Sequence, residues 1–497
     1  MLNMITDARL SGILLHRSSL PSRYGIGSLG PEAYQFIDWL VSCGQKVWQL
    51  LPLGPTDWSH SPYQCYSAFA GNPDLISLDL LVEDGLLANG DLSTLKPVSG
   101  SKINFKRVEA LRQPLLKKAF GRFTELHITD GHDYQFFWNI HSWWLESWSL
   151  FYACRANIVA KDWSEWDEGL KHREAATLEK YYFEYKTDVD YQRFLQFIFF
   201  KQWFALKNYA NAREVKIFGD IPLYVSYDSA DVWANQELFL LDEKSRPTLV
   251  GGVPPDYFSA TGQLWGNPLF DWDKLEQRGY DWWLARIHFN LTLFDWVRID
   301  HFRGLESFWA IPANETTAIG GSWMKAHGDA MLERLKSQLG DLPVIAEDLG
   351  IITEEVNQLR KKYNLPGMKV LQFAFASDAT NEHLPHQHER DFVVYTGTHD
   401  NDTTLGWLGS IAPDEKTYLS QYIGSDSPTH WDMMRLAMAS VAQIAIIPMQ
   451  DVLGLGQNGR MNKPGTVKHN WIWKMSASGF DKKLGARLLE ITQRYGR

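Results

Sequence analysis

Carboxylate side chains stand at the ends of four short apolar segments of the chain, and they are the residues best suited to do chemistry. The four are Asp220, Asp300, Glu347 and Asp400. A single acid at the end of a strand often caps the helix that follows it. Helix capping is a weaker explanation for four such acids than an acid-lined pocket. We therefore expect the four side chains to lie together.

Clustered carboxylates suggest either oxygen ligation of Mg²⁺ or Ca²⁺ or cleavage of a glycosidic bond by an acid and a nucleophile. Residues i and i+2 of a strand face the same way, so Arg298 and Asp300 point to one side. A neighbouring cation keeps a carboxylate ionised, as a nucleophile needs. Glu347 follows the apolar run Val344–Ala346, where partial burial raises a carboxyl pKa, as an acid/base group requires. These features favour the glycosidic chemistry.

Short apolar runs that end in polar residues predict the buried parallel strands that would carry the acids. Eight such runs stand out: Gly12–His16, Val47–Leu51, Val215–Asp220, Phe294–Asp300, Val344–Glu347, Lys369–Phe373, Phe392–Thr396 and Ile444–Met449. Helix-compatible segments such as Pro31–Ser42 and Glu354–Lys362 lie between many of them. Strands that alternate with helices in this number predict an α/β fold, a (β/α)8 TIM barrel, rather than a doubly wound sheet.

Two long stretches between the runs predict insertions in a single catalytic barrel domain that spans residues 1–497. Residues 72–212 contain long helical patterns, among them Tyr134–Asn157 and Asp190–Ala212, and we expect a mostly helical insertion. Residues 222–293 surround a Gly/Pro-rich centre, Gly251–Pro268, which holds too many breakers for regular structure. We expect it to be an ordered loop insertion that covers the active-site cleft, because long barrel loops lie over the site.

The composition narrows the class of function and the compartment. The formal net charge of −10 argues against a nucleic-acid binder, which needs a basic footprint. The three cysteines, Cys43, Cys65 and Cys154, include no Cys-x-x-Cys pair and predict neither a disulfide framework nor a zinc site. The N-terminus has no signal-like stretch, and no run reaches the roughly 18 apolar residues of a membrane span. We therefore expect a cytoplasmic protein without a membrane partner.

Aromatic residues are abundant, with 22 Trp, 20 Tyr and 26 Phe. Most of them should fill the core, where large flat side chains bury much surface. The alternative is a platform for flat ligands, sugar rings included. Composition alone leaves both interpretations open.

Two further patterns carry weaker chemical signals. Gly454–Gly459 fits Gly-x-Gly-x-x-Gly, but Pro464 stands where the helix of a dinucleotide site should run, so we expect no nucleotide role. His383, His386 and His388 are closely spaced in a polar segment. We interpret them as surface or substrate-contact histidines rather than as a metal site.

The segments around the acids resemble the three catalytic segments of the α-amylase clan: VRIDHFRG (297–304), AEDLG (346–350) and YTGTHDND (395–402). Further segments are similar to the amylomaltases, the 4-α-glucanotransferases or disproportionating enzymes of glycoside hydrolase family 77. They are GILLHRSSLPSRYGIGSLG, WQLLPLGPT, SPYQCYSAFAGNP, GDIPLYV, GVPPDYFSATGQLWGNP and RMNKPGT. The matches run in order from about Ser11 to about Trp473, so the resemblance covers nearly the whole chain.

The resemblance implies a role for each acid. Asp300 would be the nucleophile that forms a β-glycosyl-enzyme, Glu347 the general acid/base, and Asp400 a third carboxylate that holds the sugar hydroxyls and stabilises the transition state. In the implied substrate site, Tyr63 would stack under the sugar ring and Asp220 would bind a hydroxyl. The substrate-binding set is Ser61, Tyr63, Asp220, Gln263, Trp265, Arg298, His399 and Asn462. For each member, a structural hydrogen bond or simple packing is the alternative.

One stretch departs from the pattern of the family. After LPLGPT, members often carry Gly-Tyr-Gly-Asp, whereas this chain has Asp57-Trp58-Ser59-His60. Trp58 keeps an aromatic side chain where the tyrosine forms a secondary glucan-binding site in some members. Two glycines are lost, which leaves both the shape of the loop and the presence of that site open.

The family implies a 4-α-glucanotransferase that moves α-1,4-glucan segments to the 4-hydroxyl of another glucan or glucose by a retaining double displacement. It implies no cofactor and no metal. The expected partners are α-1,4-glucans (maltooligosaccharides, amylose, glycogen or starch) with glucose as an acceptor, and the expected state is a monomer or homodimer. A hydrolase of the same clan is the alternative, because the residues do not decide whether water or a sugar reaches the intermediate. A non-catalytic glucan-binding protein is disfavoured, since it would not need Glu347.

Overall fold

Eight parallel strands surround the centre of the molecule in the computed structural model, which describes residues 8–93, 95–98, 100–255 and 259–497. Their order along the sheet is β10-β11-β12-β1-β2-β3-β6-β9, which is the chain order read around a ring. The strands are β1 Leu10–Leu14, β2 Val47–Gln49, β3 Lys216–Ile221, β6 Trp296–Ile299, β9 Val344–Ala346, β10 Gly367–Val370, β11 Phe392–Tyr395 and β12 Ile444–Pro448. A 2.8 Å hydrogen bond from the backbone N–H of Ala346 to the carbonyl of Pro366 joins the two edge strands and closes the barrel.

The predicted (β/α)8 barrel is confirmed, and each of the eight predicted runs overlaps one barrel strand. These strands read as nearly continuous apolar runs because both of their faces are covered: β2, β6, β9, β10, β11 and β12 are buried at every position. Several boundaries differ by one to three residues, most of all at β10. The run Lys369–Phe373 extends past β10 into a 3₁₀ turn, η7 (Leu371–Phe373).

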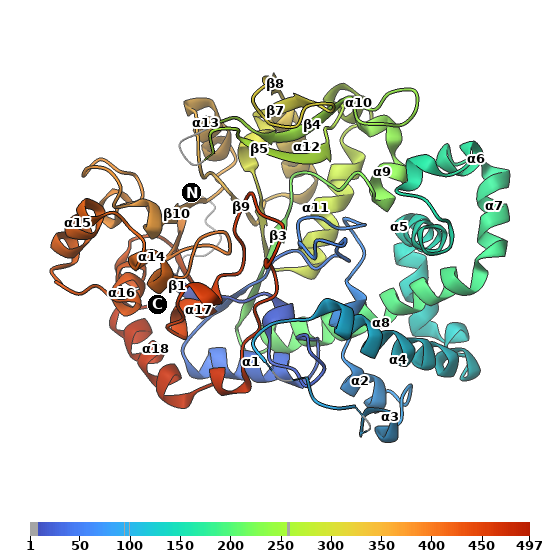
Figure 1. The fold of residues 1–497 in the computed structure, drawn as a ribbon, viewed down its shortest axis with the longest axis horizontal. Coiled ribbons are helices and arrows are strands. Elements are labelled where there is room, and N and C mark those ends of the chain that lie inside the picture. The colour runs from blue at the N-terminus through green and yellow to red at the C-terminus, as the bar shows by residue number, and fades with distance from the viewer. Residues whose placement is uncertain (1–7, 94, 99, 256–258) are drawn as a thin grey trace.

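Long helices pack around the outside of the barrel (Figure 1). They are α1 Pro31–Ser42, α8 Lys186–Asn211, α11 Asp281–Leu293, α12 Gly328–Leu339, α13 Glu354–Lys362, α16 His430–Ala439 and α18 Lys482–Arg494. The chain begins α1 with Pro31, whose fixed φ suits the first helical position. The buried residues Ala33, Phe36, Ile37 and Leu40 of α1 then follow helical spacing and form one apolar face. Helix α1 packs against α8 and α18, and α11 packs against α8 and α12.

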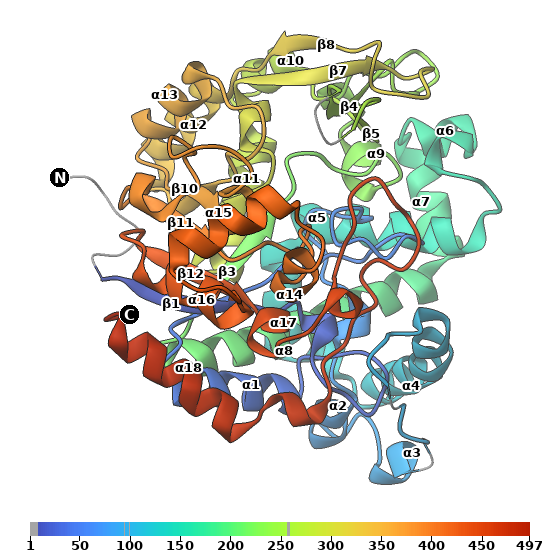
Figure 2. The ribbon, with the colours of Figure 1, turned by 60° about the vertical axis from the view of Figure 1, so that its left-hand side comes forward.

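Residues 72–212 form a lobe beside the barrel, on the right in Figures 1 and 2. Its helices before α8 are α2 Leu78–Glu83, α3 Asn89–Ser93, α4 Phe105–Glu125, α5 His132–Asn157, α6 Glu168–Lys171 and α7 Ala175–Glu184. Aromatic side chains of α5 and α8 pack together, as in the pair Phe137 and Phe197, whose ring centroids lie 5.6 Å apart. Most of the abundant aromatic residues therefore belong to one contiguous core. In the described part of the chain, no helix is both long and apolar enough to cross a membrane.

The expectation that residues 222–293 lack regular structure is wrong, whereas their place over the active-site cleft stays a prediction. The segment contains α9 Ala230–Ala234, β4 Leu249–Val253, β5 Gln263–Pro268, α10 Trp272–Gln277 and the barrel helix α11. Strands β4 and β5 join β7 Ser307–Pro312 and β8 Ser322–Lys325 in an antiparallel sheet of order β5-β4-β7-β8, which stands above the barrel in Figure 1. Residues 256–258 of the segment lie outside the described residues.

The glycines that predicted a loop are needed because β4 approaches its neighbours closely. A Cβ on Gly252 would lie 2.2 Å from the carbonyl oxygen of Gln263 on β5. A Cβ on Gly251 would lie 2.9 Å from the ring of Tyr224. Glycine at these positions therefore permits the strand pairing instead of breaking it.

Arginine side chains close the seam between the first and last barrel strands. The guanidinium of Arg497 donates to the carbonyls of Leu10, Ser440 and Ala442 at 2.8, 2.8 and 2.9 Å. Arg9 donates to carbonyls on the same side, including that of Ser440 at 2.7 Å. The two cations thus satisfy several backbone carbonyls beside this seam, and they share that of Ser440.

We expect Arg497→Ala to lower the free energy of unfolding by about 3 kcal/mol, because it removes charge-assisted hydrogen bonds and leaves carbonyls unpaired. For a chain of this size that corresponds to a fall in Tm of about 3 °C. Scanning calorimetry of the variant measures the change. Arg494→Ala is the matched control, since Arg494 is exposed and pairs with Glu490 one helical turn away; equal losses in the two variants would contradict the assignment.

Three more helices follow strands β11 and β12. They are α14 Thr404–Leu408, α15 Pro413–Ile423 and α17 Met449–Val452. Helix α14 begins directly after the predicted segment of Asp400, and α17 begins directly after β12. The fold therefore brings both helices to the carboxyl ends of the strands, the edge at which the acids stand.

Candidate active site

Strand pairing places Asp220 beside Arg298. The two residues are register partners in the parallel pair β3–β6. One guanidinium nitrogen of Arg298, Nη1, lies 2.9 and 2.7 Å from the two carboxylate oxygens of Asp220. The other nitrogen, Nη2, donates to Asp300 Oδ1 at 2.6 Å. Arg298 and Asp300 therefore share one side of the strand, as the sequence predicts, and Arg298 bridges two carboxylates.

Asp220 is more enclosed than its predicted role requires. Its side chain is completely buried, and it also accepts a 2.6 Å hydrogen bond from the hydroxyl of Tyr63. The carboxylate thus binds Arg298 and Tyr63, whereas the sequence leads us to expect contact with a sugar hydroxyl. That contact stays a prediction, and the geometry gives Asp220 a defined task in fixing the guanidinium that holds Asp300.

Glu347 follows β9 directly, and two backbone N–H groups hold its carboxyl. The amide of His301 donates to Oε2 at 2.6 Å and the amide of Leu349 donates to Oε1 at 3.0 Å. Burial raises the pKa of Glu347 to about 8, against the lowering effect of Arg298 and of the two amides. A carboxyl with this pKa holds a proton near neutral pH and can both give and take one.

The sequence offers no signal for the role of His301, which acts through its backbone. Its φ of 52° is left-handed, a conformation that is uncommon for a residue other than glycine. This turn follows Asp300 and directs the amide of His301 to Glu347. The segment after the first acid therefore positions the second, and the left-handed residue stores strain at the site.

Asp400 lies at a different strand end but faces the same site. Asn462 donates to its Oδ1 at 2.7 Å, and His399 Nε2 lies 3.4 Å from the same oxygen. The ring of His399 stacks on that of Tyr63, with centroids 5.2 Å apart and an interplanar angle of 16°. Burial and the charge of Asp220 raise the pKa of Tyr63 well above its usual value, and Asp300 and Asp400 both contribute to the shift. The structure therefore brings these acids together around Tyr63.

The antiparallel sheet reaches the site through β5. The ring of Trp265 meets that of His301 edge-on, with centroids 4.8 Å apart. Its indole N–H donates to Gln263 Oε1 at 3.1 Å. Ser61 lies one turn before Tyr63 and accepts a 3.3 Å hydrogen bond from the Tyr63 amide through Oγ. Gln263 and Trp265 thus lie beside the segment that follows Asp300, and contact of all three residues with substrate stays a prediction.

Two more residues of the site come from the C-terminal part of the chain. Trp471 packs against Tyr63 and His399, with ring centroids 6.0 and 5.8 Å away. Arg460 donates to the backbone carbonyl of Asp400 at 2.7 Å. Arg460 belongs to the RMNKPGT segment and could have been inferred from it. Trp471 lies beyond the last barrel strand, where no sequence signal points to it.

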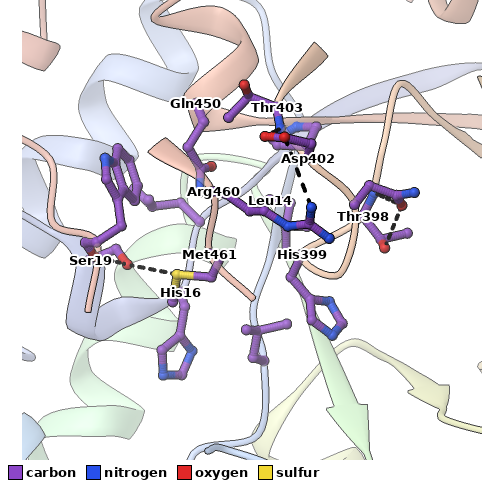
Figure 3. A pocket seen from close by; sticks show the side chains of 15 residues that line it. Leu14, His16, Ser19, Thr398, His399, Asp402, Thr403, Gln450, Arg460 and Met461 are labelled. Carbon is purple, nitrogen blue, oxygen red and sulfur yellow. Dashed lines mark hydrogen bonds and ion pairs between the residues drawn. The ribbon is translucent and has the colours of Figure 1, made fainter. Parts of the chain in front are cut away.

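A pocket lies behind His399, at the carboxyl ends of β1 and β12. His16, Asp402, Gln450 and Arg460 are among the residues that line it, and Figure 3 shows the guanidinium of Arg460 directed toward Asp402. Arg460 Nη1 lies 3.9 Å from Asp402 Oδ2. The segment that carries His399 and Asp400 therefore borders a small pocket that both polar and apolar side chains line.

The weaker sequence patterns lie outside the site. His388 is buried, so the expectation of a surface histidine is wrong for it; Nδ1 lies 2.7 Å from Ser440 Oγ and Nε2 lies 2.9 Å from the carbonyl of His383. His386 Nδ1 lies 2.9 Å from the hydroxyl of Tyr422. Within the described residues, no group of three or more His, Cys, Asp or Glu side chains is placed to hold a metal ion.

Two other sequence features have simple structural outcomes. The Gly-x-Gly-x-x-Gly match at residues 454–459 ends in a 3₁₀ turn, η9 (Gln457–Gly459), and not in the helix of a dinucleotide site. Trp58 is 73% exposed, and the following His60 stacks on Phe105 with centroids 3.7 Å apart. The loop therefore presents one open aromatic face, and a secondary glucan site there stays an open prediction.

The geometry suits a two-step reaction at a sugar carbon. Asp300 has an oxygen fixed by Arg298 and keeps part of its carboxylate exposed. Glu347 lies close enough that the charge of Asp300 helps to raise its pKa. A carboxylate held by a guanidinium beside a carboxyl with a raised pKa is the arrangement of a retaining glycosidase-type site.

Comparisons with known proteins identify the family that this chain resembles. A family model described as 4-alpha-glucanotransferase matches residues 15–479. The 4-alpha-glucanotransferase of Synechocystis sp. is 48% identical, with 99% of this chain and 98% of the relative covered. The chloroplastic/amyloplastic 4-alpha-glucanotransferase of Solanum tuberosum is 45% identical, with 99% and 87% covered. The amylomaltase of Streptococcus agalactiae, solved in complex with acarbose, matches with a TM-score of 0.96 and 38% identity over 98% of this chain and 99% of that one.

These matches extend over the barrel, the helical lobe and the antiparallel sheet together, because they cover almost the full length of the chain. They carry the name of a transferase, and they favour that activity over the hydrolase of the same clan. The chain therefore belongs to the 4-alpha-glucanotransferase family, glycoside hydrolase family 77.

Proposed function

We propose that this enzyme transfers α-1,4-glucan segments from one maltooligosaccharide to the 4-hydroxyl of another glucan or of glucose, with Asp300 as nucleophile and Glu347 as acid/base. The observation that carries the assignment is the contrast between two neighbouring carboxyls. Asp300 accepts a 2.6 Å bond from a guanidinium, whereas burial raises the pKa of Glu347 to about 8. Glu347 can thus hold a proton near neutral pH beside a carboxylate that a guanidinium fixes in place.

In the first step, Glu347 gives its proton to the glycosidic oxygen while Asp300 attacks the anomeric carbon. The bond between that carbon and the glycosidic oxygen breaks, and the reducing-end fragment leaves with the proton on its 4-hydroxyl. A covalent β-glycosyl-enzyme remains on Asp300. The amides of His301 and Leu349 bind the Glu347 carboxylate that this step creates.

In the second step, the Glu347 carboxylate takes the proton from the 4-hydroxyl of an acceptor sugar. The acceptor oxygen attacks the anomeric carbon and displaces Asp300, which restores an α-1,4 bond. One such bond is broken and one is made, so the number of reducing ends stays constant. Side chains of the enzyme supply every proton transfer, and the scheme uses no metal and no cofactor.

The other predicted residues would bind and orient the sugar. Asp400 keeps 45% of its side chain exposed, which supports a role in binding hydroxyls. Tyr63, His399 and Trp471 form an aromatic cluster that could hold one face of the ring. The relative from Streptococcus agalactiae was solved with acarbose, which supports a cleft of this kind here. Arg298 and Asp220 would act on Asp300 from behind.

Other expectations about partners and compartment belong to the same proposal. The natural substrates would be maltooligosaccharides, amylose, glycogen or starch, and the protein would act as a monomer or homodimer. Size-exclusion chromatography with light scattering measures the oligomeric state. We place the enzyme in the cytoplasm, in keeping with the free thiols of Cys43, Cys65 and Cys154.

Incubation with maltotriose tests the proposed activity. We expect glucose and a ladder of longer maltooligosaccharides. The total number of reducing ends should stay unchanged, because each transfer breaks one α-1,4 bond and makes another. Chromatography resolves the products, and separate assays measure glucose and reducing ends. A rise in reducing ends with only shorter products would identify a hydrolase instead. An unchanged substrate would contradict the proposal.

A further inference from the structure

The buried carboxylate of Asp451, which is outside the predicted site, accepts hydrogen bonds from both ends of one loop. Asp451 lies on α17, just after β12, and is 1% exposed. Its Oδ2 accepts hydrogen bonds from the hydroxyls of Thr396 and Thr404, both at 2.6 Å. Its Oδ1 accepts one from the backbone N–H of Thr404 at 2.7 Å. Three donors from two residues therefore converge on one side chain.

The two threonines stand at opposite ends of the segment that carries Asp400. Thr396 directly follows strand β11, and Thr404 is the first residue of helix α14. The residues between them include His399 and Asp400. A single carboxylate thus holds both ends of the loop: Thr396, where the chain leaves the barrel strand, and Thr404, where the next helix begins.

The interior of the loop is held by further polar contacts. Asn401 Oδ1 accepts from the amide and the hydroxyl of Thr398 at 2.8 and 2.9 Å. Gln372 donates to the carbonyl of Asp402 at 2.9 Å. Figure 3 shows that the inner side of the loop, at Thr398, Asp402 and Thr403, borders the pocket. Hydrogen bonds of Asn401 and Gln372 thus hold the interior of the loop in addition to those of Asp451 at its ends.

The cost of burying the Asp451 carboxylate also indicates that this residue positions the loop. Burial raises its pKa, and the hydrogen bonds from Thr396 and Thr404 oppose the rise. Desolvating a carboxylate has a cost that an apolar side chain of similar size would avoid. What the carboxylate provides instead is a fixed direction for three hydrogen bonds, which sets the path of the loop.

We propose that Asp451 is a positioning residue for glucan transfer, which holds the ends of the 396–404 loop so that Asp400 and His399 meet the sugar in the correct orientation. The inference rests on the proposed function, in which Asp400 binds hydroxyls of the transferred sugar. It assigns no contact with substrate to Asp451, which acts through the loop.

The first test compares kinetics of maltotriose disproportionation in Asp451→Asn, Thr396→Val and Thr404→Val. We expect kcat to fall roughly 10- to 100-fold in Asp451→Asn, with a smaller change in KM, because a displacement near 1 Å in a binding group has an effect of this size. Each threonine variant removes one hydroxyl donor at nearly constant volume and should show a smaller loss. If Asp451→Asn does not fold, the two threonine variants carry the test, and wild-type kcat in both would overturn the inference.

A double-mutant cycle separates positioning from general destabilisation. Calorimetry measures the Kd of acarbose for wild type, Asp400→Asn, Asp451→Asn and the double variant. If Asp451 acts through Asp400, the loss of affinity in the double variant is smaller than the product of the two single losses. Losses that simply multiply would overturn the inference, since they would mean that the two residues act independently.

A matched control is an aspartate that accepts hydrogen bonds from a threonine at another helix start, away from the active site. Asp432 accepts from the amide and hydroxyl of Thr429 at 2.8 and 2.7 Å where helix α16 begins, so Asp432→Asn should change Tm without changing kcat. A loss of kcat equal to that of Asp451→Asn would overturn the inference. The wild-type enzyme provides the remaining distinction: absence of disproportionation by wild type refutes the proposed function, whereas normal activity in Asp451→Asn refutes only the role of Asp451.

Discussion

Asp300→Asn should lower the rate of maltotriose disproportionation by roughly 10⁴-fold or more, because an amide cannot form the covalent intermediate that both steps share. The variant keeps the shape of the side chain, so the fold and the binding of substrate should persist. Arg298 would lose one of its two carboxylate partners but would retain Asp220 at 2.7 Å. Initial rates of glucose release from maltotriose measure the loss, and calorimetry with acarbose shows whether the site still binds a ligand.

Asp295→Asn is the matched control for this experiment. Asp295 directly precedes strand β6, at the end opposite to Asp300, and accepts from the amide of Ile217 at 2.7 Å and from Asn211 at 2.8 Å. Its replacement should affect Tm and leave kcat within a few-fold of wild type. Activity of Asp300→Asn within a factor of ten of wild type would exclude Asp300 as the nucleophile.

Glu347→Gln should lower kcat with maltotriose by about 10²- to 10⁴-fold, the range for loss of a general acid/base. The effect should depend on the leaving group. With an α-maltosyl fluoride donor, fluoride leaves without a proton, so the first step should remain fast while transfer to an acceptor stays slow. The glycosyl-enzyme should then accumulate, and mass spectrometry of the intact protein and of its peptides should locate the added sugar on Asp300.

Two outcomes would contradict this role of Glu347. Equal losses with maltotriose and with the fluoride donor would mean that Glu347 does not supply the proton to the leaving group. A label on a residue other than Asp300 would reassign the nucleophile. Glu306→Gln is a suitable control, because Glu306 pairs with Lys325 on the neighbouring β8 and has no place in the proposed reaction.

The pH dependence of both activity and stability follows from the pKa of Glu347. Since burial raises the pKa of Glu347 from 4.5 to about 8, kcat/KM should be high below that pH and fall as pH rises through about 8, where the acid loses its proton. The folding stability changes with pH in the same direction. The contribution of the protonated carboxyl to the free energy of unfolding is fully present below about pH 4.5 and is lost as the pH rises through about 8. Wild type should therefore lose Tm relative to Glu347→Gln across this interval, and parallel Tm curves would contradict the raised pKa.

The barrel and the identity of the acids can be predicted from the sequence because their causes are local. Strands with both faces buried must be apolar along their length, which is why runs such as Val344–Glu347 and Phe392–Thr396 are recognisable. The carboxyl ends of parallel strands meet at one edge, so strand order alone places Asp300 and Glu347 together. The spacing of Arg298 and Asp300 likewise fixes their common side.

The antiparallel sheet cannot be predicted in the same way. Local rules treat the glycines of β4 as breakers, since such rules contain no information on how near a partner strand will come. In the structure the close approach of Gln263 requires the absence of a side chain at Gly252. The burial of His388 beside Ser440 escapes prediction for a similar reason, because the neighbour that covers it lies far away in the chain.

Residue types and their spacing are enough to identify which side chains can react, in what order the strands carry them, and that glycosidic chemistry is the best use of those acids; transfer rather than hydrolysis follows only from the resemblance to the family. The tuning of each group depends on the three-dimensional arrangement. The pKa of Glu347 depends on burial and on the amide of His301, and the path of the Asp400 loop depends on Asp451, 51 residues further along the chain by the numbering. Desolvation and hydrogen bonding arise from atoms brought together by folding, and for that reason they cannot be derived from residue types and local spacing alone.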